Sequence, residues 1–385
     1  MVRVAEILAA GLGRHLSTHR VPESVAKACR MILACRTAAL GGHVIECEKG
    51  HVVGAAYNAC RSRSCPRCSF YRVQRWLERQ VKTLLGCAHH HIIFTIPHDL
   101  NCLWMLNYRA LGDLLFKSAG DALFTLAADP KHLGARPGVV MALHTWGQQL
   151  YLHPHAHCLV TAGGADASGN WVASRRAFLP AEPLKRLFRA KFLYGVRRLA
   201  RMDRLRLPDG WTREQVESLC RELETKRWNV RVCERYEDST AVLNYLGRYL
   251  HGGPIAERRL LDFDGSHVTF TYKDYRDQGS DGPKQKTMVL GRDEFIRRYV
   301  QHVPPKGFHM VRASGLYRHG GDASAVRDKL RLVLPAELTL HNAFTSRTLP
   351  PPANDEEIVE CSICGSRNLR ISWCPPRGAP EAVAA

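Results

Sequence analysis

The segment LHTWGQQLYLHPHAHCLVTAGG, residues 143–164, decides the fold of this chain. Apolar and β-branched residues occupy both of its ends, and Gly147 interrupts them. Such a pattern is typical of two strands joined by a turn. We therefore predict an antiparallel hairpin whose arms are residues 138–146 and 154–162.

The second arm of this hairpin carries histidines at alternate positions. Because alternate side chains of a strand share a face, His155 and His157 project together. His153 has the same parity, but it precedes a proline at the start of the strand, and its direction stays open. Two imidazoles on one face form half of a divalent-metal site, to which Gln148 or Gln149 across the turn would add an oxygen donor. The alternative is that the histidines are structural.

Hydrophobic periodicity on either side of the hairpin predicts both helices and strands. Their order fits an α+β domain in which helices pack on an antiparallel sheet. The expected helices are 23–40, 69–85, 103–127, 182–206, 213–226, 239–251 and 292–301, and the further expected strands are 90–96, 229–236, 267–273 and 285–290.

A group of cysteines near the amino terminus predicts a zinc site, because clustered cysteines in an intracellular chain are more typical of metal ligands than of disulfides. A CxxC turn brings two sulfurs to one ion, and a tetrahedral ion needs four donors. Five residues compete for the four places: Cys47, His51, Cys60, Cys65 and Cys68. We favour the four cysteines, or His51 in place of Cys60. A closed structural site is favoured over a redox or catalytic one, because a small domain lacks enough core by itself.

A second group of cysteines lies in the carboxy-terminal tail, after the proline-rich residues 350–354. Cys361 and Cys364 form another CxxC pair, and Cys374 follows. Three candidate ligands without an obvious fourth leave a second zinc site as an open alternative.

The charge of the chain indicates its partner. Among 385 residues, 55 Lys and Arg stand against 36 Asp and Glu, a formal charge of +19. This excess favours a polyanion, nucleic acid before membrane, over a basic protein without such a partner. There is no apolar run of eighteen residues and no signal-peptide core, so we expect a soluble, intracellular protein. The arginines expected to contact DNA are Arg61, Arg63, Arg67, Arg197, Arg198 and Arg201, for which a merely solvated basic face is the alternative.

Two tyrosines, Tyr245 and Tyr249, lie four residues apart in the expected helix 239–251 and therefore share one of its faces. Aromatic pairs at this spacing usually belong to a core. Beside a metal site, however, a phenol can attack a phosphodiester, and a metal ion acting as a Lewis acid would ease attack by a group whose ordinary pKa is about 10.

Several ordered motifs together resemble the HUH endonuclease superfamily, and specifically its rolling-circle, two-tyrosine insertion-sequence transposases. HPHAHCLVTAGG resembles the histidine strand of that family, and YLGRYLHGGPIAERRL resembles its tyrosine helix. CRTAALGGH at 35–43 and YNACRSRSCPRC at 57–68 look like its zinc module, and VTFTYKDYR at 268–276 and GFHMVR at 307–312 resemble its later segments. The resemblance covers residues 25–345.

This resemblance implies cleavage and joining of single-stranded DNA, without ATP, at the ends of a mobile element. The nucleophiles would be Tyr245 and Tyr249, through a 5′-phosphotyrosine intermediate. A catalytic Mg²⁺ or Mn²⁺ would be held by His155, His157 and a preceding Gln or Glu, for which we choose Gln148, and Zn²⁺ would be structural. One departure is that some relatives carry a CxxC where this chain has Cys47 and His51. The other is a small Ala156 between the paired histidines.

The resemblance also implies an HUH-endonuclease-like antiparallel sheet flanked by helices and preceded by a small zinc-binding domain. The expected parts are 1–85, a zinc-binding and DNA-contacting domain; 86–255, the catalytic domain; 256–349, the rest of the transposase domain; and 350–385, a linker and tail. The expected partner is the single-stranded or hairpin end of a mobile element, in the cytoplasm and nucleoid of a prokaryote. A replication initiator or relaxase of the same chemistry, and a non-catalytic zinc-dependent DNA-binding protein, are the alternatives.

Overall fold

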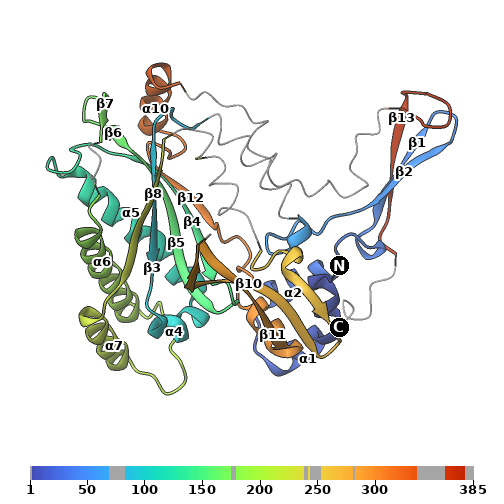
Figure 1. Ribbon diagram of the computed structural model, residues 1–385, viewed down its shortest axis with the longest axis horizontal. Helices are drawn as coiled ribbons and strands as arrows, with labels where there is room; N and C mark the ends of the chain where they lie inside the picture. Colours follow the sequence, from blue (N-terminus) through green and yellow to red (C-terminus); the bar gives the residue numbers. More distant parts are fainter. Residues whose placement is uncertain are drawn as a thin grey trace.

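The computed structural model describes residues 2–68, 83–174, 179–237, 242, 253–280, 282–335 and 360–377. Figure 1 shows a large sheet flanked by helices, a second body built around strands β10 and β11, and a narrow sheet formed by β1, β2 and β13 that stands away from both. Most of the expected helices 69–85 and 239–251 falls outside the described residues, and so do the two candidate nucleophiles, Tyr245 and Tyr249.

The large sheet has five strands in the order β12-β4-β5-β3-β8, and every neighbouring pair is antiparallel. The predicted hairpin is confirmed as its centre, and the predicted strands 90–96 and 229–236 are confirmed beside it. The fifth strand, β12, was not predicted. The bounds are β3 His89–Thr95, β4 Gly138–Trp146, β5 Leu152–Thr161, β8 Asn229–Tyr236 and β12 Val311–Gly315.

Helices cover one face of this sheet. Ala156 and Cys158 of β5 pack into the same apolar core as Phe188 and Phe192, so this face is the one that the helices bury. His155 and His157 belong to the opposite face, as their parity in the strand predicts. The covering helices are α4 Asn101–Leu106, α5 Tyr108–Ala128, α6 Ala181–Arg201 and α7 Arg213–Thr225.

The single helix expected at 103–127 is divided in two at Asn107. The Asn107 amide donates to the carbonyl oxygens of Leu103 (2.9 Å) and Arg206 (2.8 Å), and its own oxygen accepts from the Arg206 amide (2.8 Å). The backbone there has left the helical region, with φ −132° and ψ 35°. Long-range hydrogen bonds therefore override the apolar periodicity that predicted one continuous helix.

The second body joins the amino terminus to the segment that follows the expected tyrosine helix. Val4, Ile7, Leu8 and Leu12 of α1 recur at helical spacing, are almost fully buried and share a core with Phe295 and Tyr299 of α9. Residues of α1, α2 and the cysteine loop, from the region 1–85 that was expected as a domain of its own, thus share one core with residues between Ile255 and Val303. The elements are α1 Val4–Thr18, α2 Glu23–Leu33, η3 Glu257–Arg259, β9 Leu260–Phe263, β10 His267–Gly279, β11 Gly282–Gly291 and α9 Arg292–Val300. This confirms the predicted strand pair and the helix at 292–301.

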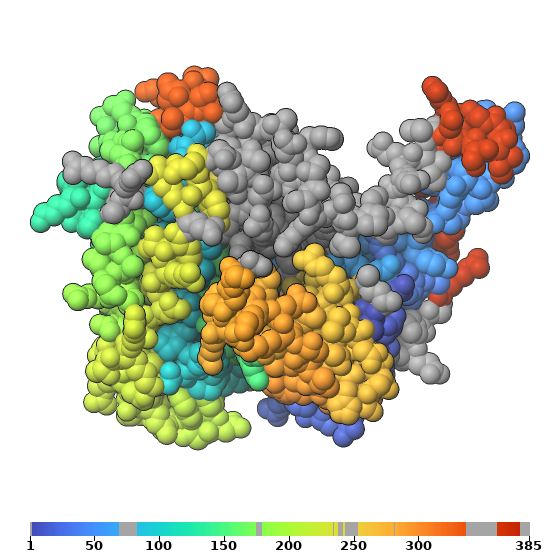
Figure 2. Space-filling model, in the orientation of Figure 1, coloured from blue at the N-terminus to red at the C-terminus, as the bar shows by residue number. Residues whose placement is uncertain are grey.

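The narrow sheet combines the two ends of the chain. β1 Gly42–Cys47 and β2 Val52–Tyr57 form a hairpin, and β13 Leu369–Cys374 from the tail pairs with β1. The tail is therefore part of a sheet with the amino-terminal hairpin, as Figure 2 shows for the red and light-blue segments. The remaining elements are η1 Ala38–Leu40, η2 His98–Leu100, β6 Gly163–Ala165, β7 Trp171–Ala173 and α10 Asp322–Val333. Within the described residues, no helix is both long enough and apolar enough to cross a membrane.

Candidate active site and zinc-binding clusters

Three histidines converge on the open face of the large sheet. One ring nitrogen of each of His144, His155 and His157 lies within 4.8 Å of those of the other two, and the Nε2 atoms of His155 and His157 are 3.1 Å apart. The third histidine is there because β4 and β5 pair in a register that sets His144 directly opposite His155. The described residues thus offer three imidazole donors to one point.

Hydrogen bonds behind the rings orient them. The Nδ1 of His155 donates to the backbone oxygen of His153 (2.6 Å), which leaves its Nε2 lone pair facing the cluster. The Nδ1 of His157 is 3.0 Å from the Nε2 of His91, so the His157 Nε2 faces the cluster as well. Burial, followed by the charge of nearby His144, lowers the pKa of His155 and His157 well below the ordinary value. Both rings are therefore neutral, the form in which imidazole binds a metal.

The predicted oxygen donor, Gln148, is occupied elsewhere. Its side-chain oxygen accepts a hydrogen bond from the backbone amide of Lys273 in β10 (3.4 Å), and its backbone oxygen accepts from the guanidinium of Arg259. The third donor that the structure brings to the pair is His144. His153 lies outside the cluster, with its Nδ1 3.1 Å from the Nε2 of His98.

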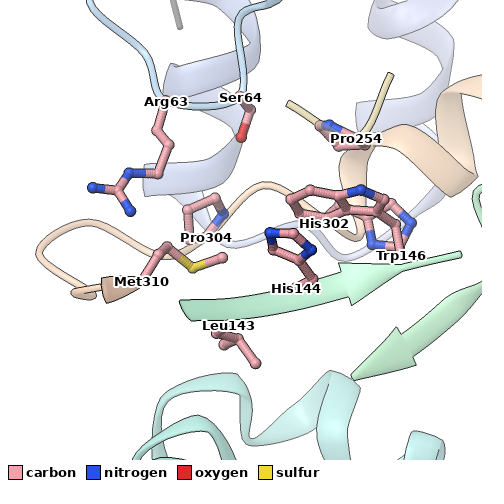
Figure 3. A pocket seen from close by; sticks show the side chains of 9 residues that line it. All are labelled: Arg63, Ser64, Leu143, His144, Trp146, Pro254, His302, Pro304 and Met310. Carbon is pink, nitrogen blue, oxygen red and sulfur yellow. The ribbon is translucent and has the colours of Figure 1, made fainter. Parts of the chain in front are cut away.

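A pocket lies beside His144, and Figure 3 shows the side chains that line it. His144 stacks on Trp146 at a centroid distance of 4.7 Å and an interplanar angle of 16°. The loop between Cys60 and Cys65 contributes Arg63, one of the arginines expected to contact DNA. The complete lining is Arg63, Ser64, Leu143, His144, Trp146, Pro254, His302, Pro304 and Met310.

The loop that carries Arg63 is fixed on two sides. The Tyr299 hydroxyl of α9 donates to the Ser64 backbone oxygen (2.6 Å). On the other side Gly253 approaches so closely that a Cβ there would lie 2.4 Å from the same oxygen. Only glycine allows this contact. The zinc-module loop, α9 and the segment just after the expected tyrosine helix therefore meet at one wall of the pocket.

Four buried cysteines form the first metal cluster: Cys35, Cys60, Cys65 and Cys68. The Cys35 sulfur is 3.3 Å from that of Cys68 and 3.7 Å from that of Cys65, and the Cys60 and Cys68 sulfurs are 3.6 Å apart. A tetrahedral zinc ion with bonds of about 2.3 Å separates its sulfur ligands by about 3.8 Å. Hydrogen bonding to its neighbours, to Cys35 first, lowers the pKa of the Cys68 thiol, which favours the thiolate that zinc binds.

Cys35 was not among the expected ligands, because the sequence pattern placed it on the apolar face of a helix running to residue 40. The helix ends at Leu33, and Arg36 adopts a left-handed conformation with φ 58°. Its backbone amide donates to the Asn58 oxygen (3.0 Å), which holds this turn beside the cysteine loop. Cys35 therefore lies in a chain reversal just after the helix, and the helical periodicity of the sequence concealed this turn.

Cys47 and His51 do not join this cluster. The structure divides the single expected site in two, since Cys47 and His51 form a second cluster with Cys361 and Cys364 of the tail. Cys374 is not a member, because the β1–β13 register sets it opposite Gly42, at the other end of the strand from Cys47.

The expected DNA-contacting arginines separate into groups. Arg61 and Arg63 lie in the loop between Cys60 and Cys65, and Arg67 lies between Cys65 and Cys68. Arg197 is engaged in ion pairs within the protein, because its guanidinium donates to Glu217 (2.9 Å) and Glu224 (2.6 Å) of α7. Arg198 and Arg201 are exposed, but α6 covers the sheet face opposite to the histidines. The helix therefore does not form a surface continuous with the histidine face.

Comparisons with known proteins agree with this arrangement. Residues 7–96 match the family described as "Transposase zinc-binding domain", and residues 138–324 match that described as "Putative transposase". The chain is 38% identical over 340 residues to "Putative transposase y4qJ" of Sinorhizobium fredii (strain NBRC 101917 / NGR234), covering 86% of this chain and 84% of that one. It is 34% identical over 350 residues to "Transposase for insertion sequence element IS801" of Pseudomonas savastanoi pv. phaseolicola, covering 87% and 80%.

The fold, the cysteine cluster and these matches define a transposase, a DNA-processing enzyme, with an amino-terminal zinc-binding domain. More narrowly, the chain belongs to the IS91 family of insertion-sequence transposases. The resemblance inferred from the motifs is thereby confirmed, as are the α+β class, the DNA partner and the structural zinc.

Proposed function

We propose that this transposase nicks and rejoins single-stranded DNA at the ends of its element through a 5′-phosphotyrosine intermediate. The observation that carries the proposal is the convergence of His144, His155 and His157 within 4.8 Å beside a pocket that also holds an arginine of the zinc-module loop. Two different requirements of phosphoryl transfer, a metal site and a phosphate-binding cation, then meet on one face of the sheet.

The three histidines fit a divalent cation. His155 and His157 are neutral, and the Nδ1 atom of each lies within hydrogen-bond distance of a group outside the cluster. One ring nitrogen of each of the three histidines, His144 included, lies within 4.8 Å of those of the other two. Three protein ligands leave positions for phosphate oxygens, as a catalytic site requires. A bound Mg²⁺ or Mn²⁺ would supply Lewis-acid polarisation of the scissile phosphate. The revised ligand set replaces the expected Gln148 with His144.

Tyr245 and Tyr249 remain the proposed nucleophiles. Pro254 lines the pocket beside His144 and follows Tyr249 by five residues. Five residues of chain span at most about 18 Å, and this short separation in sequence supports a role for the tyrosine at the pocket. In the proposed step a tyrosine oxygen bonds to phosphorus, the bond from phosphorus to the 3′ oxygen breaks, the phenol gives up its proton, and the 3′ oxygen takes one up.

The proposed role of Arg63 is to hold the scissile phosphate. Its guanidinium can donate two parallel hydrogen bonds to phosphate oxygens. The loop geometry supports this role, because the cysteine cluster, Tyr299 and Gly253 fix the backbone on either side of the residue. The arginine is thus preorganised to bind phosphate before DNA arrives.

Tyrosine substitution tests the mechanism. We expect the variant with both Tyr245→Phe and Tyr249→Phe to form no covalent adduct with a single-stranded oligonucleotide that carries the element end, in the presence of Mn²⁺. Tyr194→Phe is the matched control, because this tyrosine is 60% exposed on α6, across the sheet from the histidines, and should leave adduct formation unchanged. An adduct formed by the double variant would refute the proposal.

Metal dependence separates this function from that of a non-catalytic DNA-binding protein. DNA binding without any nicking dependent on Mg²⁺ or Mn²⁺ would favour the latter. Membership of a transposase family favours transposition over replication initiation by the same chemistry.

A further inference from the structure

We propose that Cys47, His51, Cys361 and Cys364 bind a structural Zn²⁺ that fastens the carboxy-terminal segment 360–377 to the amino-terminal hairpin. The segment 360–377 lies outside both family matches, which cover residues 7–96 and 138–324. The proposal is independent of the nicking chemistry.

The distances fit one tetrahedral ion. The Cys47 sulfur is 3.7 Å from the Cys364 sulfur, close to the edge of about 3.8 Å expected for two zinc-bound sulfurs. The His51 Nδ1 is 3.5 Å from the Cys47 sulfur and 3.8 Å from the Cys361 sulfur. All four ligand atoms lie within 4.8 Å of one another. A disulfide needs sulfurs about 2.05 Å apart, so the geometry points to a metal instead.

Each pair of ligands lies on its own tight turn. In the hairpin, the Gly50 amide donates to the Cys47 oxygen (2.9 Å), and Gly50 has φ 81°. In the tail, the Gly365 amide donates to the Cys361 oxygen (2.8 Å), and Gly365 has φ 70°. Both glycines occupy the left-handed region that they alone adopt without strain. Two such knuckles facing one another are the common construction of a structural zinc site.

Contacts other than those among the four ligand side chains hold the same two turns together. The Glu48 amide donates to the Asn368 backbone oxygen (3.2 Å). The Glu48 carboxylate accepts from the Ser366 hydroxyl (2.9 Å) and from the Asn368 side-chain amide (3.1 Å). Six consecutive residues of β13 then pair with β1, from Leu369 opposite Cys47 to Cys374 opposite Gly42. A continuous interface between the amino-terminal hairpin and the segment 360–377 thus brings the cysteines of the two turns together.

A metal is needed here because the narrow sheet has little core. Its large apolar residues are mostly in water: Tyr57 is 56% exposed, Ile371 66% and Trp373 62%. A three-stranded sheet without a buried face is marginal in stability, and a structural zinc ion supplies the missing folding free energy. Four protein ligands fill the coordination sphere and leave no open position, which excludes a catalytic role for this ion.

The tail also continues from this site to the first cysteine cluster. The Arg377 amide donates to the Ala38 oxygen (2.9 Å), three residues after Cys35. At Gly41, with φ 68°, a Cβ would lie 2.5 Å from the Cys374 backbone oxygen. The tail therefore braces the chain between the two clusters, and the zinc module is complete only with residues from both ends of the protein.

Zinc content tests the proposal in the full chain. To keep the histidine cluster from contributing, every variant carries His155→Ala and His157→Ala. We expect two zinc ions per chain by elemental analysis, and one after Cys361→Ser with Cys364→Ser. Cys374→Ser is the matched control, because this cysteine lies on β13 outside the cluster, and it should retain two. Unchanged zinc content after loss of Cys361 and Cys364 would overturn the proposal.

A second measurement leaves all four ligands in place. A protease recognition sequence inserted after Pro352 allows the folded chain to be cut ahead of the tail. We expect the tail to stay bound to the body during gel filtration under reducing conditions, and to be released by a zinc chelator. Dissociation without chelator would contradict the proposal, and so would release by a reductant alone, which would indicate a disulfide.

Discussion

Replacing His144 with alanine removes one of three imidazole donors from the candidate catalytic site. The substitution tests whether His144 or Gln148 is the third metal ligand. Loss of a hydrogen-bonding residue behind a metal ligand already weakens metal binding by about 10- to 100-fold. Loss of a ligand in direct contact should therefore weaken metal binding by at least about 100-fold, or about 2.8 kcal/mol at 1.4 kcal/mol per tenfold. His155 and His157 would remain in place, because their own bonds to His153 and His91 are unchanged.

Gln148→Ala provides the comparison. The Gln148 side-chain oxygen makes only a long bond of 3.4 Å to the Lys273 amide, so its removal should change metal affinity by less than about threefold. The assay is titration of Mn²⁺ into each zinc-loaded variant, followed by electron paramagnetic resonance of the free ion, with nicking measured against Mn²⁺ concentration. If Gln148→Ala weakened binding more than His144→Ala, the ligand set argued from the β4–β5 register would be wrong.

Two other predictions concern charge. Arg63→Ala should lower the nicking rate by about 10- to 100-fold, because a charge-assisted hydrogen bond to phosphate contributes about 1.5–3 kcal/mol. Arg198→Ala with Arg201→Ala, on the helix across the sheet, should leave the rate within about twofold, and an equal loss in both variants would place DNA on α6 after all. Burial lowers the pKa of His302 to about 4, so the folded state keeps this ring neutral while the unfolded chain protonates it below about 6.5. The contribution of neutral His302 to the free energy of unfolding should therefore be fully present above pH 6.5 and should fall by roughly 3 kcal/mol toward pH 4. In urea denaturation, the free energy of unfolding of a His302→Gln variant should fall less steeply over the same pH range.

The zinc module and the candidate active site are one structural unit. Ser64 of the cysteine loop accepts from Tyr299 and packs on Gly253, while its neighbour Arg63 lines the pocket beside His144. Removal of zinc from the first cluster would therefore disturb the phosphate-binding wall as well as the amino-terminal fold.

The arginines that contribute to the positive charge of the chain differ in where they lie and in what they contact. Arg63 lines the pocket, whereas Arg197 is paired with Glu217 and Glu224. Arg197 therefore stabilises the packing of α6 against α7, and Arg63 brings a cation to the pocket beside His144.

The local parts of the site were predictable from the sequence because they depend on local geometry. Alternation within a strand puts His155 and His157 on one face, and the CxxC turns bring Cys65 to Cys68 and Cys361 to Cys364. The hairpin, the flanking strands and the α+β class follow from periodicity over a few residues. The family resemblance rested on the same motifs.

What only the tertiary structure decided are the partners from distant parts of the chain. His144 reaches the histidine pair through the β4–β5 register, and α9 and the residues just after it hold the turn that joins these strands. Arg298 of α9 donates to the Gln149 oxygen (3.0 Å), and His302, two residues beyond the helix, donates to the Leu150 oxygen (3.0 Å). A one-residue slip of that register would send His144 to the opposite face. Cys35 and the tail cysteines likewise find their clusters through a chain reversal and through pairing of strands more than 300 residues apart. Periodicity in the sequence indicates which side of a helix or strand is buried. The register between elements, however, depends on contacts between residues that are far apart in the sequence. Those contacts complete the metal sites.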